Sequence, residues 1–110
     1  MSSNETLGNL QQLAMLAVHR AGPDAHGSRL QGELETHADR RVTISTVYVT
    51  LDRLEGKGFV RSWLGDATPV RGGKPRRHYA LTDRGVEALR RTRDVMDRMW
   101  KGVDLPDPAS

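Results

Sequence analysis

The chain has 110 residues, a formal net charge of +3 at pH 7 and an isoelectric point near 9.8. That length suits one small domain, and the basic balance is compatible with nucleic-acid binding without proving it. Because the sequence has no cysteine, disulfide bonds, thiol catalysis and thiolate metal sites are excluded. The six-residue apolar stretch at residues 13–18 is too short to span a bilayer and lacks the layout of a signal peptide. We therefore expect a soluble cytoplasmic protein with no membrane partner.

The first predicted element is a helix over residues 7–20, which Gly22-Pro23 ends. Four apolar residues share one side of it at helical spacing: Leu10, Leu13, Ala14 and Ala17. Leu16 and Val18 fall off this stripe, so the helix has two apolar sides and needs two packing partners. The second partner is either the rest of the core or another copy of the chain, and we place Leu10 and Leu13 at a dimer interface.

A second, shorter helix is predicted over residues 26–37, with Leu30 and Leu34 one turn apart. The polar connection that follows contains Arg40 and Arg41, directly before the next helix. Cationic side chains and free backbone N–H groups converge on phosphates at such a point. The alternative is a solvated pair of charges in a turn.

The third helix, over residues 43–57, carries the outward face that points to a function. Thr43 is its expected N-cap, and Gly56 and Gly58 mark its end. The core side holds four aliphatic residues: Ile44, Val47, Leu51 and Leu54. The opposite side and its flanks are small, hydroxyl-bearing and partly cationic: Ser45, Thr46, Tyr48, Val49 and Arg53. A solvated helix face usually mixes Lys and Glu, so this face fits a polar, anionic partner such as a DNA groove.

Two strands of a hairpin are predicted over residues 59–64 and 76–81, which alternate apolar and polar side chains. The connection between them is too rich in Gly and Pro for a helix and long for a hairpin. Residues 67–82 hold four cationic residues, two glycines that let the backbone approach a neighbour, and no acid: Arg71, Gly72, Gly73, Lys74, Arg76 and Arg77. The run is either a solvated face or a basic wing over residues 65–78 that contacts phosphates or the minor groove, and we favour the wing.

The last predicted helix starts at Thr82, an N-cap followed by Asp83 in the first turn. A heptad seam then recurs at alternating steps of three and four residues, interrupted only by a cation: Val86, Leu89, Arg93, Met96, Trp100 and Val103. Because nothing in the chain covers this seam fully, a symmetric homodimer is the expected solution. We divide the chain into a winged helix-turn-helix domain over residues 7–82 and a dimerisation helix over residues 83–103.

Residues 45–60, STVYVTLDRLEGKGFV, and residues 71–89, RGGKPRRHYALTDRGVEAL, together resemble the PadR-like family of transcriptional regulators. The shared pattern is a Tyr in the recognition helix, LDRLE–KG–V, a TP–RGG–R–Y wing and an LT–G helix start. The resemblance implies a mainly α fold with a small β-hairpin (α+β), binding of double-stranded DNA at a promoter or operator, and repression. The sequence departs from the pattern at Ala25-His26-Gly27, where many members have an aromatic residue beside the glycine.

The leading hypothesis is a sequence-specific regulator whose recognition helix lies in the major groove. The expected DNA contacts outside the wing are Arg40, Arg41, Thr43, Ser45, Thr46, Tyr48, Val49 and Arg53. Ser45, Thr46 and Val49 would meet base edges or thymine methyl groups. Tyr48 has two interpretations: its hydroxyl reaches a phosphate, which the resemblance favours, or the residue is wholly structural. We have no account of the outward Asp52.

A second hypothesis adds an effector. Some members of the family bind flat aromatic compounds between the protomers, and Met96, Met99 and Trp100 would suit such stacking. The alternative is that Trp100 only fills the dimer core. A third hypothesis, a winged helix used only for protein contact, is disfavoured by the basic wing.

Motifs of catalysis and metal binding are missing from the sequence. The four histidines are far apart in the sequence and lack metal-ligand spacing such as HExxH. The paired carboxylates Asp94 and Asp97 fit a solvated helix face better than acid–base catalysis. No nucleotide-binding or nucleophile motif occurs. We expect no enzymatic activity and no cofactor.

Overall fold

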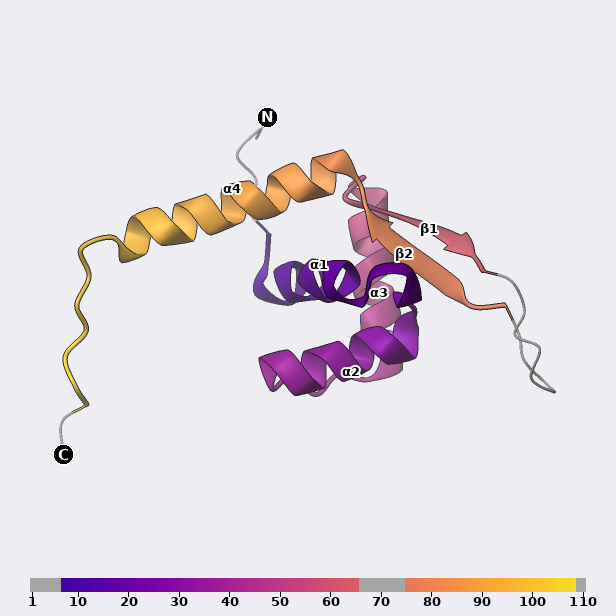
Figure 1. The fold of residues 1–110 in the computed structure, drawn as a ribbon, viewed down its shortest axis with the longest axis horizontal. Coiled ribbons are helices and arrows are strands. Elements are labelled where there is room, and N and C mark those ends of the chain that lie inside the picture. The colour runs from indigo at the N-terminus through magenta and orange to yellow at the C-terminus, as the bar shows by residue number, and fades with distance from the viewer. Residues whose placement is uncertain (1–6, 66–74, 109–110) are drawn as a thin grey trace.

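The computed structural model of the chain describes residues 7–65 and 75–108. Its elements follow one another as α1 (Asn9–Ala21), η1 (Gly22–Asp24), α2 (Gly27–Ala38), α3 (Ile44–Gly56), β1 (Val60–Leu64), β2 (Arg77–Leu81) and α4 (Asp83–Trp100) (Figure 1). The four α-helices and the two-stranded hairpin confirm the expected α+β fold. Predicted boundaries lie within two residues of the observed ones, except that α4 ends three residues early.

The first three helices pack against one another, and the hairpin flanks α1 and α3. One core joins these elements, and its largest fully buried side chains are Met15, Leu30, Leu51, Leu54, Val60 and Tyr79. Truncating a buried leucine in such a core costs about 2–5 kcal/mol, because the transfer free energy is lost and a cavity is left. The core therefore fixes the angle at which α3 crosses α1 and α2.

The two residues of the expected second apolar side of α1 differ in burial: Val18 lies in the core, and Leu16 is 42% exposed in one copy of the chain. One detail of α3 differs from the prediction. Ile44, expected on the core side of α3, is 37% exposed, because it lies in the first turn, beside Gly27 and beyond the cover of the core. Thr50 is buried instead, and its hydroxyl donates to the Thr46 carbonyl at 2.8 Å.

The hairpin pairs in antiparallel register, with Val60 opposite Leu81 and Ser62 opposite Tyr79. The link between η1 and α2 extends it on the other edge of β2: the Tyr79 N–H donates to the Ala25 carbonyl at 3.0 Å, and His26 forms a bridge with His78. No sequence signal predicted this third short segment of the sheet. It ties the beginning of α2 to the base of the hairpin.

The junction between the hairpin and α4 explains the LT–G pattern. The Thr82 hydroxyl oxygen accepts from the Gly85 N–H at 3.0 Å, which confirms the predicted N-cap, and the hydroxyl donates to the Gly58 carbonyl at 2.6 Å. A Cβ at Gly85 would collide with the Phe59 carbonyl oxygen. Only glycine therefore lets α4 start so close to the chain that enters β1.

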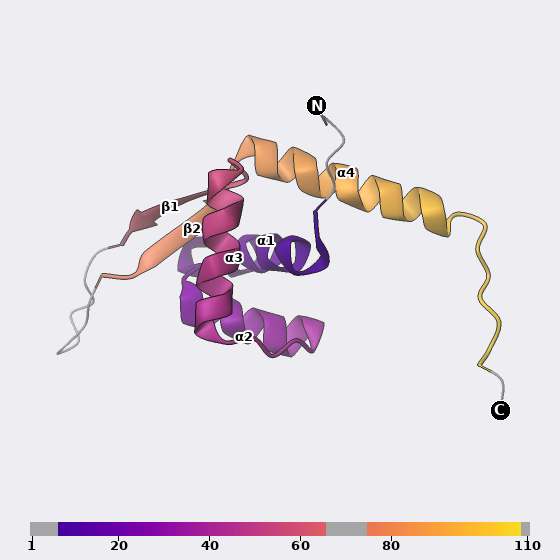
Figure 2. The ribbon, with the colours of Figure 1, turned by 180° about the vertical axis from the view of Figure 1, so that it is seen from behind.

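α4 has two unlike halves. Its first half packs on the core through Ala88, and Thr92 accepts from the Leu7 N–H at 3.3 Å. Its second half extends away from the other helices, as both views show (Figures 1 and 2). Among the described residues, no helix is long and apolar enough to cross a membrane.

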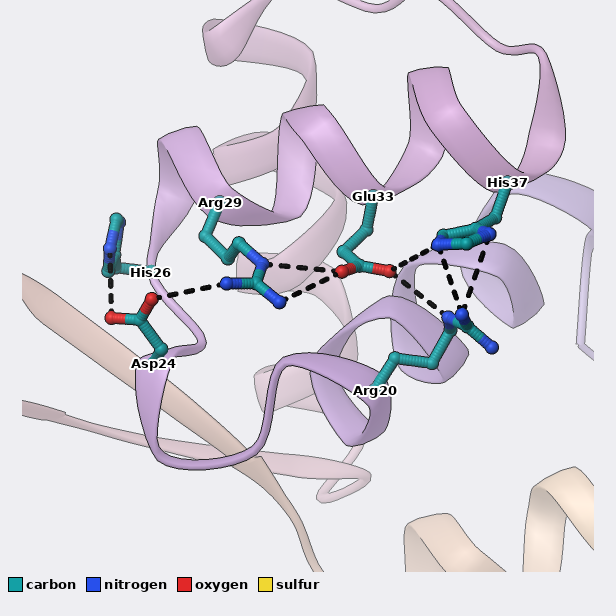
Figure 3. A network of polar contacts seen from close by, with 6 residues as sticks. All are labelled: Arg20, Asp24, His26, Arg29, Glu33 and His37. Atoms are coloured by element: carbon teal, nitrogen blue, oxygen red, sulfur yellow. Dashed lines mark hydrogen bonds and ion pairs between the residues drawn. The ribbon is translucent and has the colours of Figure 1, made fainter.

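A network of charges bridges α1 and α2 (Figure 3). The Glu33 carboxylate, whose side chain is only 10% exposed, accepts from Arg20 Nε at 3.1 Å and from Arg29 Nε at 3.2 Å. His37 lies 3.5 Å from the same carboxylate, and Arg29 reaches on to Asp24 at 3.4 Å. The hydrogen bond from Arg20, together with Arg29 and His37, holds the pKa of Glu33 below its usual value of 4.5.

Candidate nucleic-acid interface

The beginning of α3 is ordered by two threonine hydroxyls. Thr43 Oγ1 accepts from the Thr46 N–H at 3.1 Å, as expected of an N-cap, and lies 3.0 Å from the Thr46 hydroxyl. The first turn thus presents hydroxyls and free N–H groups at the positive end of the helix dipole, which attracts anions. At the other end, Gly58 adopts φ = +81° and its N–H donates to the Glu55 carbonyl at 2.9 Å, so the predicted stop is confirmed.

The outward side of α3 is not covered by any other described element (Figure 2). Ser45, Val49 and Arg53 are exposed, with Val49 49% exposed, while Thr46 is half-buried at the border. An aliphatic side chain that stands out among small hydroxyl groups is free to contact another apolar group, such as a thymine methyl. The sequence pattern had placed these residues on one face.

Tyr48 packs across the first turn of α2. A Cβ at Gly27 would collide with the Tyr48 hydroxyl, so the glycine makes room for the ring, which is half-exposed. The hydroxyl therefore lies beside the N-terminus of α2, where backbone N–H groups also attract anions. Both interpretations of Tyr48 agree with this placement, and the phosphate contact stays a prediction.

The two arginines before α3 have different surroundings. Arg41 pairs with Glu35 at 3.3 Å on an open surface, a contact of about 0–1 kcal/mol. The Arg40 N–H donates to the Leu34 carbonyl at 3.0 Å after Asp39, which adopts φ = +50° and turns the chain. The α2–α3 turn is thus fixed by the backbone, and the Arg41 side chain is on its surface.

The described part of the wing is its base. Arg71, Gly72, Gly73 and Lys74 lie outside the described residues. The Arg77 guanidinium donates to Ser62 Oγ at 3.0 Å, and that hydroxyl donates to the Glu55 carboxylate at 2.9 Å. Arg77 is therefore linked through β1 to the end of α3. Because side chains alternate along a strand, Arg76 lies on the opposite face, where its Nη1 is 3.3 Å from His26 Nε2.

Tyr79 lies between the hairpin and α3. Its hydroxyl is buried and has no hydrogen-bond partner among the described residues. Burial, with Asp52 and Tyr48 nearby, raises the pKa of Tyr79 to about 12. The phenol therefore stays neutral at physiological pH. The Asp52 carboxylate thus adds negative potential near that hydroxyl.

The expected dimer residues divide into two groups. Leu10 and Leu13 are partly buried against the chain's own core, whereas Met96, Trp100 and Val103 are exposed. Val86, Leu89 and Arg93 line a groove of about 560 Å³ between α1 and α4, together with Gln12, Leu16, His19, Leu81 and Arg90. The groove residues of α1 were not predicted as a site, although the position of Leu16 outside the apolar stripe was their signal.

At the end of α4, a shallow pocket of about 350 Å³ is lined by Met99, Trp100, Val103 and Leu105. Met96, the third expected ligand residue, is exposed nearby on α4 but does not line it. Among the described residues, no group of three or more His, Asp or Glu side chains could hold a metal ion.

Three helices, of which α2 and α3 form the helix-turn-helix, followed by a hairpin, define a winged helix-turn-helix fold. Residues 15–91 match the model of the transcriptional regulator PadR-like family. The chain is 35% identical over 85 residues to Transcriptional regulator Rv3488 of Mycobacterium tuberculosis (strain ATCC 25618 / H37Rv), which is 77% of this chain and 75% of that protein.

Solved structures agree with this match. A PadR-like transcription factor from Bacteroides fragilis has a TM-score of 0.71 and 25% identity, with 84% of each chain covered. A PadR family transcriptional regulator from Eggerthella lenta DSM 2243 has a TM-score of 0.66 and 27% identity, with 84% of this chain and 80% of that chain covered. The chain therefore belongs to the PadR-like family, a family of DNA-binding transcriptional regulators and not of enzymes.

Proposed function

We propose that the chain is a sequence-specific repressor that binds its operator as a dimer, with α3 in the major groove. The observation that carries the proposal is the uncovered, hydroxyl-rich outward face of α3, capped by Thr43 and adjoining a basic hairpin. Val49 is exposed at the centre of this face. A groove that offers thymine methyl groups and base-edge acceptors complements it.

The contacts divide by their role. Ser45, Thr46 and Val49 read base edges, and Tyr48 and Arg53 contact the backbone on either side. Phosphate contacts come from the α2–α3 turn and from the wing over residues 65–78: Arg40, Arg41, Thr43, Arg71, Gly72, Gly73, Lys74, Arg76 and Arg77. These cations supply affinity for any sequence, whereas the α3 residues supply specificity.

Residues 7–82 would act as the DNA-binding domain and residues 83–103 as the dimerisation helix. The exposed second half of α4 and the groove along α1 support this division, because both leave apolar surface uncovered in one copy. A two-fold dimer would place its two α3 helices about 34 Å apart, one turn of DNA, and so would read a palindromic operator.

An effector site is a second candidate function. The half-exposed indole of Trp100 beside Met99 favours it, since two copies of this pocket near a two-fold axis would form a flat apolar space. Planar aromatic cations that quench the fluorescence of the unmodified chain, but not the remaining fluorescence of Trp100→Leu, would support this effector site.

Fluorescence anisotropy with the chain's own promoter and a scrambled duplex tests the main proposal. We expect at least ~10³-fold tighter binding to the promoter, with a steep loss of affinity as salt rises. Arg53→Ala should weaken binding, whereas Arg98→Ala, which removes an equal charge from the far end of α4, should not. Absence of binding at low salt would overturn the proposal and favour a module for protein contact.

A further inference from the structure

His26 lies at the point where the beginning of α2 meets the base of the wing. His26 is only 8% exposed, and its Nδ1 is 3.3 Å from Ser28 Oγ. Its Nε2 has two neighbours at equal distance: Asp24 Oδ1 at 3.3 Å and Arg76 Nη1 at 3.3 Å. Figure 3 shows Asp24 between His26 and Arg29.

Arg76 and Asp24 require opposite protonation states of Nε2. A guanidinium can only donate, so Arg76 needs a bare Nε2 with a lone pair. A carboxylate can only accept, so Asp24 needs an Nε2 that carries a proton. A neutral ring with its proton on Nδ1, toward Ser28, satisfies Arg76, whereas a ring with its proton on Nε2 satisfies Asp24. Only the ring that carries both protons is charged and also repels Arg76. Nε2 can therefore form a hydrogen bond with only one of these two neighbours at a time.

The charged partner is already in position. Arg29 holds the second Asp24 oxygen at 3.4 Å, and Arg29 is itself held by Glu33. The other groups that face His26 are Arg76 and the His78 ring, whose centroid is 5.8 Å away and which is stacked on Trp63. His26 thus faces the Asp24 carboxylate, the Arg76 guanidinium and the His78 ring, and Arg29 lies behind Asp24.

Arg76 combines an anchored backbone with an exposed side chain. The Gly65 N–H donates to the Arg76 carbonyl at 2.7 Å, so the hairpin is still paired at this residue. The side chain is exposed apart from its contact with His26, and it points to the face of the hairpin opposite Arg77 and α3. Loss of the His26 contact would let the guanidinium turn toward a phosphate beside the wing.

We propose that His26 is a positioning residue that holds Arg76 when neutral and releases it to the DNA backbone when protonated. The chain would then bind DNA more tightly, and with one more phosphate contact, in mildly acidic conditions. This inference rests on the proposed DNA-binding function. It concerns a residue that touches no DNA and acts only through Arg76.

The test measures promoter affinity over a salt series at about pH 5.5 and about pH 8, on either side of the usual range of imidazole titration. For the unmodified chain we expect a gain of up to about fivefold at the lower pH, the size of one exposed ion pair. The salt slope should also steepen by about 0.9, the value of one phosphate contact. Arg76→Ala should lose both changes.

Two variants separate His26 from the other histidines. His26→Gln offers an uncharged acceptor to Arg76 at both pH values, so the steeper slope should disappear. His37→Gln removes another imidazole ring, from the exposed end of α2 and away from Arg76, and should keep the steeper slope. Circular dichroism at both pH values checks that each variant is folded. If His26→Gln does not fold, the loss of the pH-dependent slope in Arg76→Ala, a substitution at an exposed residue, remains the test.

Each outcome is informative. An equal change of slope in Arg76→Ala and the unmodified chain, or a retained change in His26→Gln, would overturn the role of His26 while leaving the repressor proposal intact. A change that disappears in His37→Gln would assign the effect to His37 and also overturn it. A chain that binds no duplex at either pH would contradict the proposed function itself.

Discussion

The charge network of α1 and α2 and the outward face of α3 use polar side chains in opposite ways. In the network, one carboxylate is surrounded by Arg20, Arg29 and His37 at 3.1–3.5 Å, so the charges satisfy one another. On α3, Arg53 forms no ion pair with any described residue, and the exposed hydroxyl of Ser45 faces outward. The first surface stabilises the fold, and the second is left for a partner.

The largest effect that separates the two surfaces is expected at the centre of α3. Val49→Ala should weaken promoter binding by about 1–3 kcal/mol, because a base-edge contact is lost, and should leave Tm unchanged. Anisotropy and thermal unfolding of the same samples would measure both. A fall in Tm equal to the loss of affinity would mean that Val49 is structural.

Thr43 and Thr82 are both helix N-caps, so the same substitution can be made at the proposed DNA surface and away from it. Thr43→Ala and Thr82→Ala should each lower the free energy of unfolding by about 1 kcal/mol, since each leaves a helix N–H without its acceptor. Only Thr43→Ala should also weaken DNA binding. Equal losses of affinity in the two variants would contradict a role for Thr43 at the interface.

Glu33→Gln should change stability and not DNA binding, which is the reverse of Val49→Ala. The substitution removes the carboxylate that Arg20, Arg29 and His37 share, so Tm should fall while promoter affinity is kept. Because Arg20 and its neighbours lower the pKa of Glu33, the stability that it contributes is present above 4.5 and is lost as pH falls through the lower folded value. The Tm difference between the unmodified chain and Glu33→Gln should therefore close in acid, and a constant difference would argue against an ionic origin.

The smallest effect is expected at Arg41. Its pair with Glu35 is highly exposed, so Arg41→Ala should change the free energy of unfolding by less than about 0.5 kcal/mol. If Arg41 contacts a phosphate, the salt slope should flatten by about one unit, equally for promoter and scrambled DNA. An unchanged slope would assign Arg41 to a solvated turn.

Local signals explain why most of the fold could be predicted. Thr43, Thr82 and Gly58 act through neighbours in sequence, so caps and helix ends follow from short patterns. Ile44 was placed less well, because burial near a helix end depends on which distant element covers it. The same holds for the bridge between His26 and His78, which joins segments 52 residues apart and has no periodicity to reveal it.

In the candidate site, too, the features set by local sequence were predicted and those set by contacts between distant elements were not. Helical spacing alone predicted the shared face of Ser45, Val49 and Arg53. It could not predict that Gly27 makes room for Tyr48, or that neighbouring arginines at the base of the wing turn to opposite faces. Those arrangements depend on how α2, α3 and the hairpin meet.

The uncovered second half of α4 has a consequence for gene control. If a second copy covers Met96, Trp100 and Val103, the DNA-binding species forms by a bimolecular reaction. At concentrations below the dimer dissociation constant, operator occupancy would then grow with the square of the protein concentration. A target gene would respond weakly to small amounts of the regulator and sharply above a threshold that the apolar surface of one helix sets.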